Sequence, residues 1–183
     1  MKHIFFILLV TLMFSTIILQ GCVDQNNSGS KLVTASLNTL GFKSNELPYT
    51  IIKQNETFNN TEIFVEFPQN VTVRFLEVYR VEYVINETQI LLTLDMKKLN
   101  STDVAKEQFE REKIDLSDSN YDIITAETIG DESIVGRDRD LYLIIFRKYN
   151  IVATIIPSVY KGLSIQDFID YTKIIVNHIE SSV

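Results

Sequence analysis

The chain has 183 residues, of which 45% are hydrophobic and 22% charged, and its formal net charge is −7. This composition excludes an intrinsically disordered chain, which would be poorer in apolar residues. The excess of acidic residues also argues against a nucleic-acid partner, because binding to phosphates requires clusters of Lys and Arg.

The first 21 residues are typical of a secretory signal peptide. Lys2 provides a positive charge, sixteen uncharged residues from Ile4 to Leu19 form an apolar core, and Gly21 is a small residue before a polar stretch. The core is long for a signal, and an uncleaved membrane helix, which needs about 20 apolar residues, is the alternative. Both interpretations place the rest of the chain outside the cell.

Cys22 is the only cysteine, and it directly follows Leu19-Gln20-Gly21. This run resembles the lipobox of prokaryotic lipoproteins, in which the cysteine is lipidated and becomes the mature N-terminus. Gln20 departs from the pattern, where a small residue is usual. The resemblance implies lipidation of Cys22, and the alternative is a cysteine that ends a membrane helix, since Cys is at home in apolar surroundings.

Residues 22–30 are polar and contain Gly and Ser, which predicts a flexible tether. Without the first 21 residues, 162 remain and the net charge becomes −8, because Lys2 is the only charged residue removed. That length fits one domain. We therefore expect residues 31–183 to form a single extracytoplasmic domain.

The apolar pattern of this domain predicts strands, although residues 31–60 give no firm element. The expected strands are 63–67, 71–85, 90–96, 121–128, 141–146 and 151–156. Glu77 falls where an apolar residue is due, so a bulge or turn is expected at 76–78. The runs 141–146 and 151–156 are almost entirely apolar, which favours central strands that are covered on both faces.

Two helices are predicted. Ser101 or Thr102 can cap the first, and Ser164 and Asp167 have the spacing of a capping box at the start of the second. The second helix has one buried face, formed by Phe168, Ile169, Thr172, Ile175, Val176 and Ile179. His178 lies away from that face and is expected at the surface. The order of strands, helix, strands and helix predicts an α+β fold, an antiparallel sheet with helices packed on it.

Six of the thirteen asparagines lie in the N-x-[ST] acceptor pattern for N-glycosylation, whereas about two are expected by chance. They are Asn26, Asn55, Asn59, Asn70, Asn86 and Asn100. One interpretation is a glycosylated surface protein with its sugars on one side. The other is drift in a half of the chain that is rich in Asn and Thr.

Catalytic motifs are absent from the sequence, which has no G-x-S-x-G, H-E-x-x-H, C-x-x-C or glycine-rich phosphate loop. Its two histidines are His3, in the signal, and His178, and with Cys22 at the anchor the domain keeps no thiol. The sequence thus predicts neither a nucleophile beside a base nor a cofactor.

Two polar clusters are candidate metal sites, with Asp118, Asn120, Asp122, Asp138 and Asp140 as their possible ligands. The first cluster begins like a calcium loop. It then has Ile123 where the turn needs Gly, and Ile129 where the loop needs a bidentate Glu. Both clusters are therefore interpreted as solvated loops and not as metal sites.

Several tyrosines occupy strand positions, among them Tyr79, Tyr83, Tyr142 and Tyr149. Tyrosines at such positions can line a ligand cleft. More often they belong to the core or its rim, with the ring buried and the hydroxyl at water.

Several segments carry a resemblance to a known family: Leu47-Pro48, Y-R-V-E-Y at 79–83, I-G-D-E-S at 129–133, F-R-K-Y-N-I-V at 146–152, and the C-terminal amphipathic helix. Together they resemble uncharacterised exported lipoproteins of archaea with a PsbP-like α/β/α sandwich. The resemblance implies a non-catalytic accessory or binding module. Gly130, Asp131 and Asn150 carry over as structural turn residues only.

The leading functional hypothesis is therefore a membrane-anchored lipoprotein domain outside the cell that binds an unknown protein partner. Two alternatives stay open. One is an exported metal-dependent hydrolase or ion-binding protein that uses the aspartate-rich loops, and the other is a small-molecule receptor with a tyrosine-lined cleft.

The lipobox resemblance generates a first prediction. Cys22→Ser should release the domain from membranes or leave a longer, unprocessed chain, because the serine hydroxyl cannot take the thioether-linked lipid. Membrane fractionation with intact-mass measurement checks this. A Cys22→Ser protein that stays membrane-bound, and that has the chain length and lipid content of the wild type, would instead establish the uncleaved helix.

Overall fold

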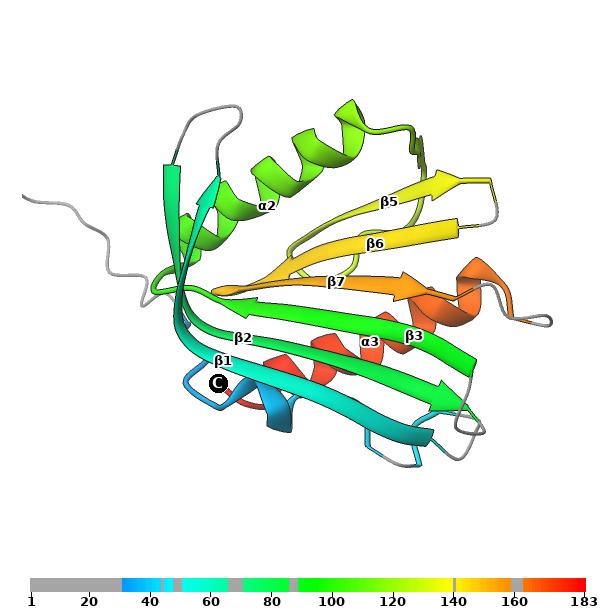
Figure 1. Cartoon of the computed structure of the whole chain (residues 1–183), viewed down its shortest axis with the longest axis horizontal. Helices are drawn as coiled ribbons and strands as arrows, with labels where there is room; N and C mark the ends of the chain where they lie inside the picture. The colour runs from blue at the N-terminus through cyan, green and yellow to red at the C-terminus, as the bar shows by residue number, and fades with distance from the viewer. Residues whose placement is uncertain are drawn as a thin grey trace, which may run out of the picture. The chain divides into compact units, whose positions relative to one another are not determined.

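An antiparallel sheet is the framework of the domain (Figure 1). The computed structural model describes residues 31–43, 45–47, 51–65, 71–85, 89–139, 141–158 and 163–183. These contain seven strands: β1 (Ile51–Val65), β2 (Val71–Ile85), β3 (Gln89–Lys98), β4 (Asp122–Ile124), β5 (Glu132–Asp138), β6 (Leu141–Lys148) and β7 (Ile151–Pro157). They also contain the helices α2 (Thr102–Asp118) and α3 (Ile165–Glu180) and the short 3-10 helix η1 (Leu37–Thr39).

The strands lie in the order β1-β2-β3-β7-β6-β5-β4, and every neighbouring pair is antiparallel. The predicted α+β class with an antiparallel sheet is thus confirmed. Residues 1–30, with the expected signal or anchor and the tether, lie outside the described residues.

Helices cover both faces of the central strands. In Figure 1, α3 passes behind β3 and β7, and α2 lies at the top of the view. Along β7, Ile151, Ala153 and Ile155 belong to the core on the α3 side, whereas Val152 belongs to the core on the α2 side. The prediction that these almost wholly apolar strands are covered on both faces holds for residues 144–146 and 151–153. It fails toward the other ends of the strands, where Leu141 and Ile156 are 45% and 41% exposed.

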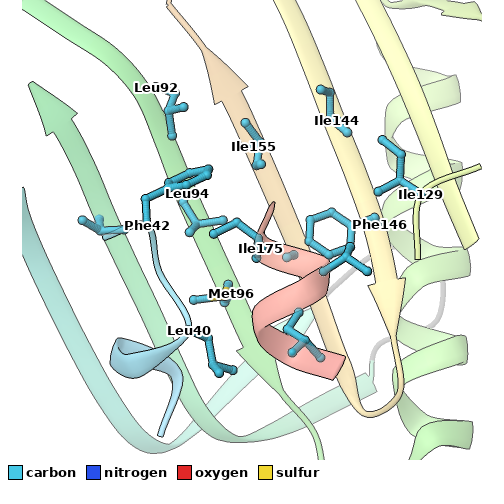
Figure 2. Packing of buried hydrophobic residues seen from close by; sticks show 14 of the residues in the cluster. Leu40, Phe42, Leu92, Leu94, Met96, Ile129, Ile144, Phe146, Ile155 and Ile175 are labelled. Atoms are coloured by element: carbon cyan, nitrogen blue, oxygen red, sulfur yellow. The ribbon is translucent and has the colours of Figure 1, made fainter. Parts of the chain in front are cut away.

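Helix α3 forms as its sequence predicts. Ser164 caps it, with a capping box in which the Asp167 carboxylate accepts a hydrogen bond from the Ser164 backbone N–H at 2.7 Å. All six residues of the expected apolar face are buried. Figure 2 shows Ile175 of α3 among Met96 of β3 and Phe146 of β6.

Helix α2 begins after Ser101, whose hydroxyl accepts a hydrogen bond from the Val104 N–H at 3.2 Å. Ala105, Phe109 and Leu116 are buried in the core on the α2 side. This core is smaller than the one on the α3 side, so α2 leaves part of its sheet face uncovered, as described below.

Two strands were missed or misplaced by the sequence patterns. β1 begins at Ile51, twelve residues before the predicted strand, and it pairs with β2 from Ile51↔Ile85 to Val65↔Val71. An edge strand takes its order from one neighbour's backbone and does not need an apolar stripe, so its sequence carries little signal.

β5 was interpreted as a loop because Gly136-Arg137-Asp138 is polar. Gly136 is nevertheless buried, since a Cβ there would lie 2.9 Å from the Leu116 side chain. The expected strand at 121–128 is reduced to β4, which pairs with β5.

The bulge predicted at 76–78 is wrong. The β1–β2 pairing keeps one register along its whole length, and the irregularity lies instead between Tyr83 and Val84 in the pairing with β3. Glu77 faces inward, as its place in the alternation requires, and it is only 4% exposed. Glu77 is buried because a segment near the N-terminal end of the domain covers it and is hydrogen-bonded to it.

That segment, here called the strap, comprises residues 31–43 and 45–47. Apart from η1 it has no regular structure, and no described strand pairs with its backbone. Its buried apolar side chains are Val33, Leu37, Leu40, Phe42 and Leu47. Burial of each contributes about 1.5–3 kcal/mol, but the backbone N–H and C=O groups buried with them need partners.

Side chains from the sheet provide those partners at the start of the strap. Glu77 accepts hydrogen bonds from the Ser36 hydroxyl at 2.6 Å and the Leu37 N–H at 2.9 Å. Lys98 donates to the Ala35 carbonyl at 2.9 Å and pairs with Glu77 at 2.7 Å. Burial alone would raise the pKa of Glu77, but Lys98, Ser36 and the Leu37 N–H outweigh it and hold that pKa below its ordinary value.

Asn150, 2% exposed, joins the strap to the β6–β7 turn. Its amide oxygen accepts from the Val33 N–H at 2.7 Å, and its amide nitrogen donates to the Leu99 carbonyl at 2.9 Å. One side chain thus links the strap, the end of β3 and the turn.

The end of the strap is held by Tyr83 and His178. The Tyr83 hydroxyl accepts from the Phe42 N–H at 2.9 Å. His178 Nδ1 lies 3.1 Å from the Leu40 carbonyl oxygen, and Nε2 lies 2.8 Å from a Glu46 carboxylate oxygen. Both partners only accept hydrogen bonds, so the two contacts are made together when both ring nitrogens carry hydrogen.

The expectation that His178 is a surface residue is therefore wrong, because its side chain is only 14% exposed. The helical wheel placed it correctly on the flank of α3. The strap, which the sequence did not place, covers that flank.

The Glu77–Lys98 pair generates a second prediction. Glu77→Gln leaves Lys98 without its charge partner in a buried place, which should cost about 3–5 kcal/mol of unfolding free energy. Glu107→Gln, on the exposed face of α2, should change it by less than about 0.5 kcal/mol. Thermal or denaturant unfolding at pH 7 measures both.

The pH dependence has a defined sign. Because the pKa of Glu77 is lower in the fold than its ordinary value of 4.5, its stabilisation is complete above that value and is lost as the pH falls through the folded pKa. The wild-type protein should lose stability below pH 4.5 more steeply than Glu77→Gln. Parallel pH profiles for the two proteins would show that Glu77 does not hold the strap.

Candidate binding surface

The sheet face next to α2 carries aligned rows of side chains. Residues paired across antiparallel strands share a face, so the register of β2, β3 and β7 defines three rows. They are Val78–Lys97–Val152, Arg80–Asp95–Thr154 and Glu82–Thr93–Ile156. Six of these nine residues are charged or polar, whereas the same strands present almost wholly apolar residues to α3.

Two ion pairs organise these rows. Arg80 Nη2 contacts Asp95 Oδ2 at 2.6 Å, and Lys97 Nζ contacts Glu112 of α2 at 2.7 Å. The Thr154 hydroxyl donates to the other Glu112 oxygen at 3.3 Å. Asp95 and Glu112 therefore each have a cation beside them.

Two acceptor atoms of this network have no hydrogen-bond partner in the described part of the chain. They are Asp95 Oδ1 and Gln108 Oε1, and both residues are 8% exposed. The other end of the Gln108 amide donates to Glu112 at 2.8 Å. A buried acceptor that lacks a donor costs about 1–3 kcal/mol, so the network has unused capacity for hydrogen bonding.

Exposed apolar side chains border the polar rows. Phe58 of β1 pairs with Val78, which puts it on the same face, and it is 50% exposed. Ile156, at the end of the third row, is 41% exposed. We call this surface, from Phe58 through Arg80 to Ile156, the α2-side face. It contains an aromatic residue and an Arg, and both residue types are enriched in protein interfaces.

A pocket of about 520 Å³ lies beside the start of the strap. The ion-paired Glu77 and Lys98 line it, and so do Leu32 and Leu76, which are 37% and 39% exposed. Other lining residues are Val33, Thr34, Asn59, Leu99, Asn100 and Asn150. We call this cavity the ion-pair pocket.

The aspartate candidates that the structure describes do not form a metal-binding cluster. Asp118 is the last residue of α2, and Asp122 of β4 pairs with Arg137 of β5. Asp140 lies outside the described residues. Among the residues that the structure describes, no group of three His, Cys, Asp or Glu side chains could hold a metal ion.

The tyrosine candidates are also separated. Tyr79 and Tyr83 are buried in the core on the α3 side. The ring of Tyr142 lies 5.8 Å from the Arg137 guanidinium, and that of Tyr149 lies 4.9 Å from Lys148 Nζ. These four residues therefore do not line a common cleft.

The turn residues named with the family resemblance are structural, as expected. Gly130 has φ 69°, and a Cβ there would lie 2.6 Å from the Arg147 carbonyl oxygen. Asp131 accepts from the Tyr149 N–H at 2.9 Å and pairs with Arg147 at 3.0 Å. Asn150 has the junction role described above.

Of the six glycosylation candidates, Asn59 and Asn100 have described, exposed side chains, and both line the ion-pair pocket. Asn55 lies in β1, but its side chain is outside what the structure describes, as are Asn26, Asn70 and Asn86 altogether. Cys22 is outside it as well. Within the described ranges, no helix is both long and apolar enough to span a membrane.

The α2-side face was not identified from the sequence. Its signal was present, because Arg80, Glu82, Asp95 and Lys97 alternate with the core residues of β2 and β3. Comparison of the chain with protein-family models, curated proteins and solved structures gave no match.

Proposed function

We propose that this chain is a membrane-anchored, extracytoplasmic, non-catalytic module that binds a protein partner through the α2-side face. In this proposal residues 1–21 export the chain, Cys22 carries the lipid, and residues 22–30 are the tether. The uncharged run Ile4–Leu19 and the lipobox-like Leu19-Gln20-Gly21-Cys22 support the anchor.

The observation that carries the binding role is the contrast between the two sheet faces. The α3 side is closed by α3 and the strap, whereas the α2 side leaves Phe58 and Ile156 exposed beside ion-paired residues. Side chains that ion pairs already hold in place lose less conformational entropy on binding. Such a surface is suited to a partner whose apolar groups meet Phe58 while its polar groups meet Arg80.

The engagement of His178 supports a non-catalytic role. Both of its ring nitrogens contact the strap, at 3.1 Å and 2.8 Å. A general base needs a nitrogen that can approach a substrate, and using His178 in this way would release Leu40 and Glu46.

The domain is further proposed to be a PsbP-like α/β/α sandwich. The turn residues at 129–133 and 146–152 and the order of strands and helices support this assignment. Fold alone names no ligand.

The test compares matched surface variants in native membranes. Phe58→Ser combined with Ile156→Ser should weaken partner capture by at least about tenfold, which corresponds to about 1.4 kcal/mol, because truncation of a hot-spot residue costs about 2 kcal/mol or more. Ile114→Ser, at a residue of α2 that is 46% exposed, is the control and should bind like wild type. Melting temperatures verify that all three proteins are folded.

Site-specific photo-crosslinking identifies the partner. A crosslinker at residue 58 should give a discrete adduct that a crosslinker at residue 114 does not. Equal capture by the double variant and the wild type would contradict binding at this face.

A further inference from the structure

We infer that Asn59 and Asn100 carry N-linked glycans whose first sugars cover the ion-pair pocket. The inference rests on the proposed location outside the cell, because the modification occurs on exported chains. It adds an occupant for the ion-pair pocket to the proposed function. This pocket is separate from the α2-side face, because Phe58, Arg80 and Ile156 do not line it.

Convergence of two acceptor sites is the first observation. Asn59-Asn60-Thr61 and Asn100-Ser101-Thr102 both fit the acceptor pattern. Asn59 lies on the edge strand β1, and Asn100 lies between β3 and α2, yet both exposed side chains line the same pocket. Residues so far apart in sequence meet there only through the fold.

The pocket's chemistry is the second observation. Glu77 and Lys98 pair with each other, and each of them, like Asn150, is hydrogen-bonded to the strap. These polar lining residues therefore do not require a charged ligand. The apolar surface of Leu32 and Leu76, in contrast, is left exposed to water. A sugar ring can cover such area with its C–H groups while its hydroxyls remain in water.

The size and access also fit. A volume of about 520 Å³ lies within the range of about 300–1,000 Å³ in which proteins hold small molecules. A glycan on either asparagine is attached to a residue that lines the pocket. Its first sugar is therefore tethered at the pocket, and occupancy needs little further loss of translational freedom.

The covalent step is an ordinary glycosyl transfer. The side-chain amide nitrogen forms a bond to the anomeric carbon of a lipid-carried sugar donor, and the bond from that carbon to the donor's phosphate oxygen breaks. The phosphate leaves with the electron pair, and the amide nitrogen loses one proton. A membrane transferase, not this chain, would catalyse the reaction.

The first arm of the test is glycopeptide mass spectrometry on protein from its native membranes, combined with protease accessibility in intact cells. The expected result is an accessible domain with sugar on the peptides that contain Asn59 and Asn100. An accessible domain with both peptides unmodified would overturn this inference alone. A domain protected from protease would overturn the proposed location instead.

The second arm tests coverage of the pocket. Leu76→Cys should react with a thiol reagent at least about tenfold more slowly in glycosylated protein than in the same protein with Asn59→Gln and Asn100→Gln, because attached sugar is bulky. Asn120→Gln, an exposed asparagine outside the acceptor pattern, should leave the rate unchanged. Ile114→Cys should react equally fast in all backgrounds. Equal rates at residue 76 despite occupied sites would overturn coverage of the pocket.

Discussion

No described strand pairs with the strap. Its buried backbone N–H and C=O groups therefore need side chains as hydrogen-bond partners. Glu77, Lys98, Asn150, Tyr83 and His178 provide them from β2, β3, the β6–β7 turn and α3. Among them, Glu77 stands where the strand alternation would otherwise place an apolar residue. Hydrophobic burial supplies most of the free energy, but an unpaired N–H or C=O would cost about 1–3 kcal/mol each, so these contacts determine where the strap lies.

The strap also explains why the two faces of the sheet differ. With α3 it covers the core on one face, which includes Leu47 and, as Figure 2 shows, Leu40 and Phe42. No comparable segment among the described residues covers the α2 side, where the charged rows reach the surface. The proposed division of roles follows: one face is used for stability, and the other is offered to a partner.

Elements with a strong apolar period were predictable from the sequence, and those held by polar contacts were not. The apolar face of α3 and the continuous apolar runs of β6 and β7 predicted these three elements correctly. The strap did not, because Asn150 meets Val33 across 117 positions, and His178 was misplaced for the same reason. The aspartate loops followed a local motif, whereas the α2-side face depends on β7 lying between β3 and β6, an order that no local pattern contains.

Hydrogen exchange of the strap amides tests the account most directly. The N–H groups of Val33, Leu37 and Phe42 each donate to a buried side chain, and they should exchange as slowly as amides in β7, since they open only when the domain unfolds. Exchange at the rate of an unstructured peptide at all three, in a protein whose β7 amides remain protected, would show that the strap is not part of the fold.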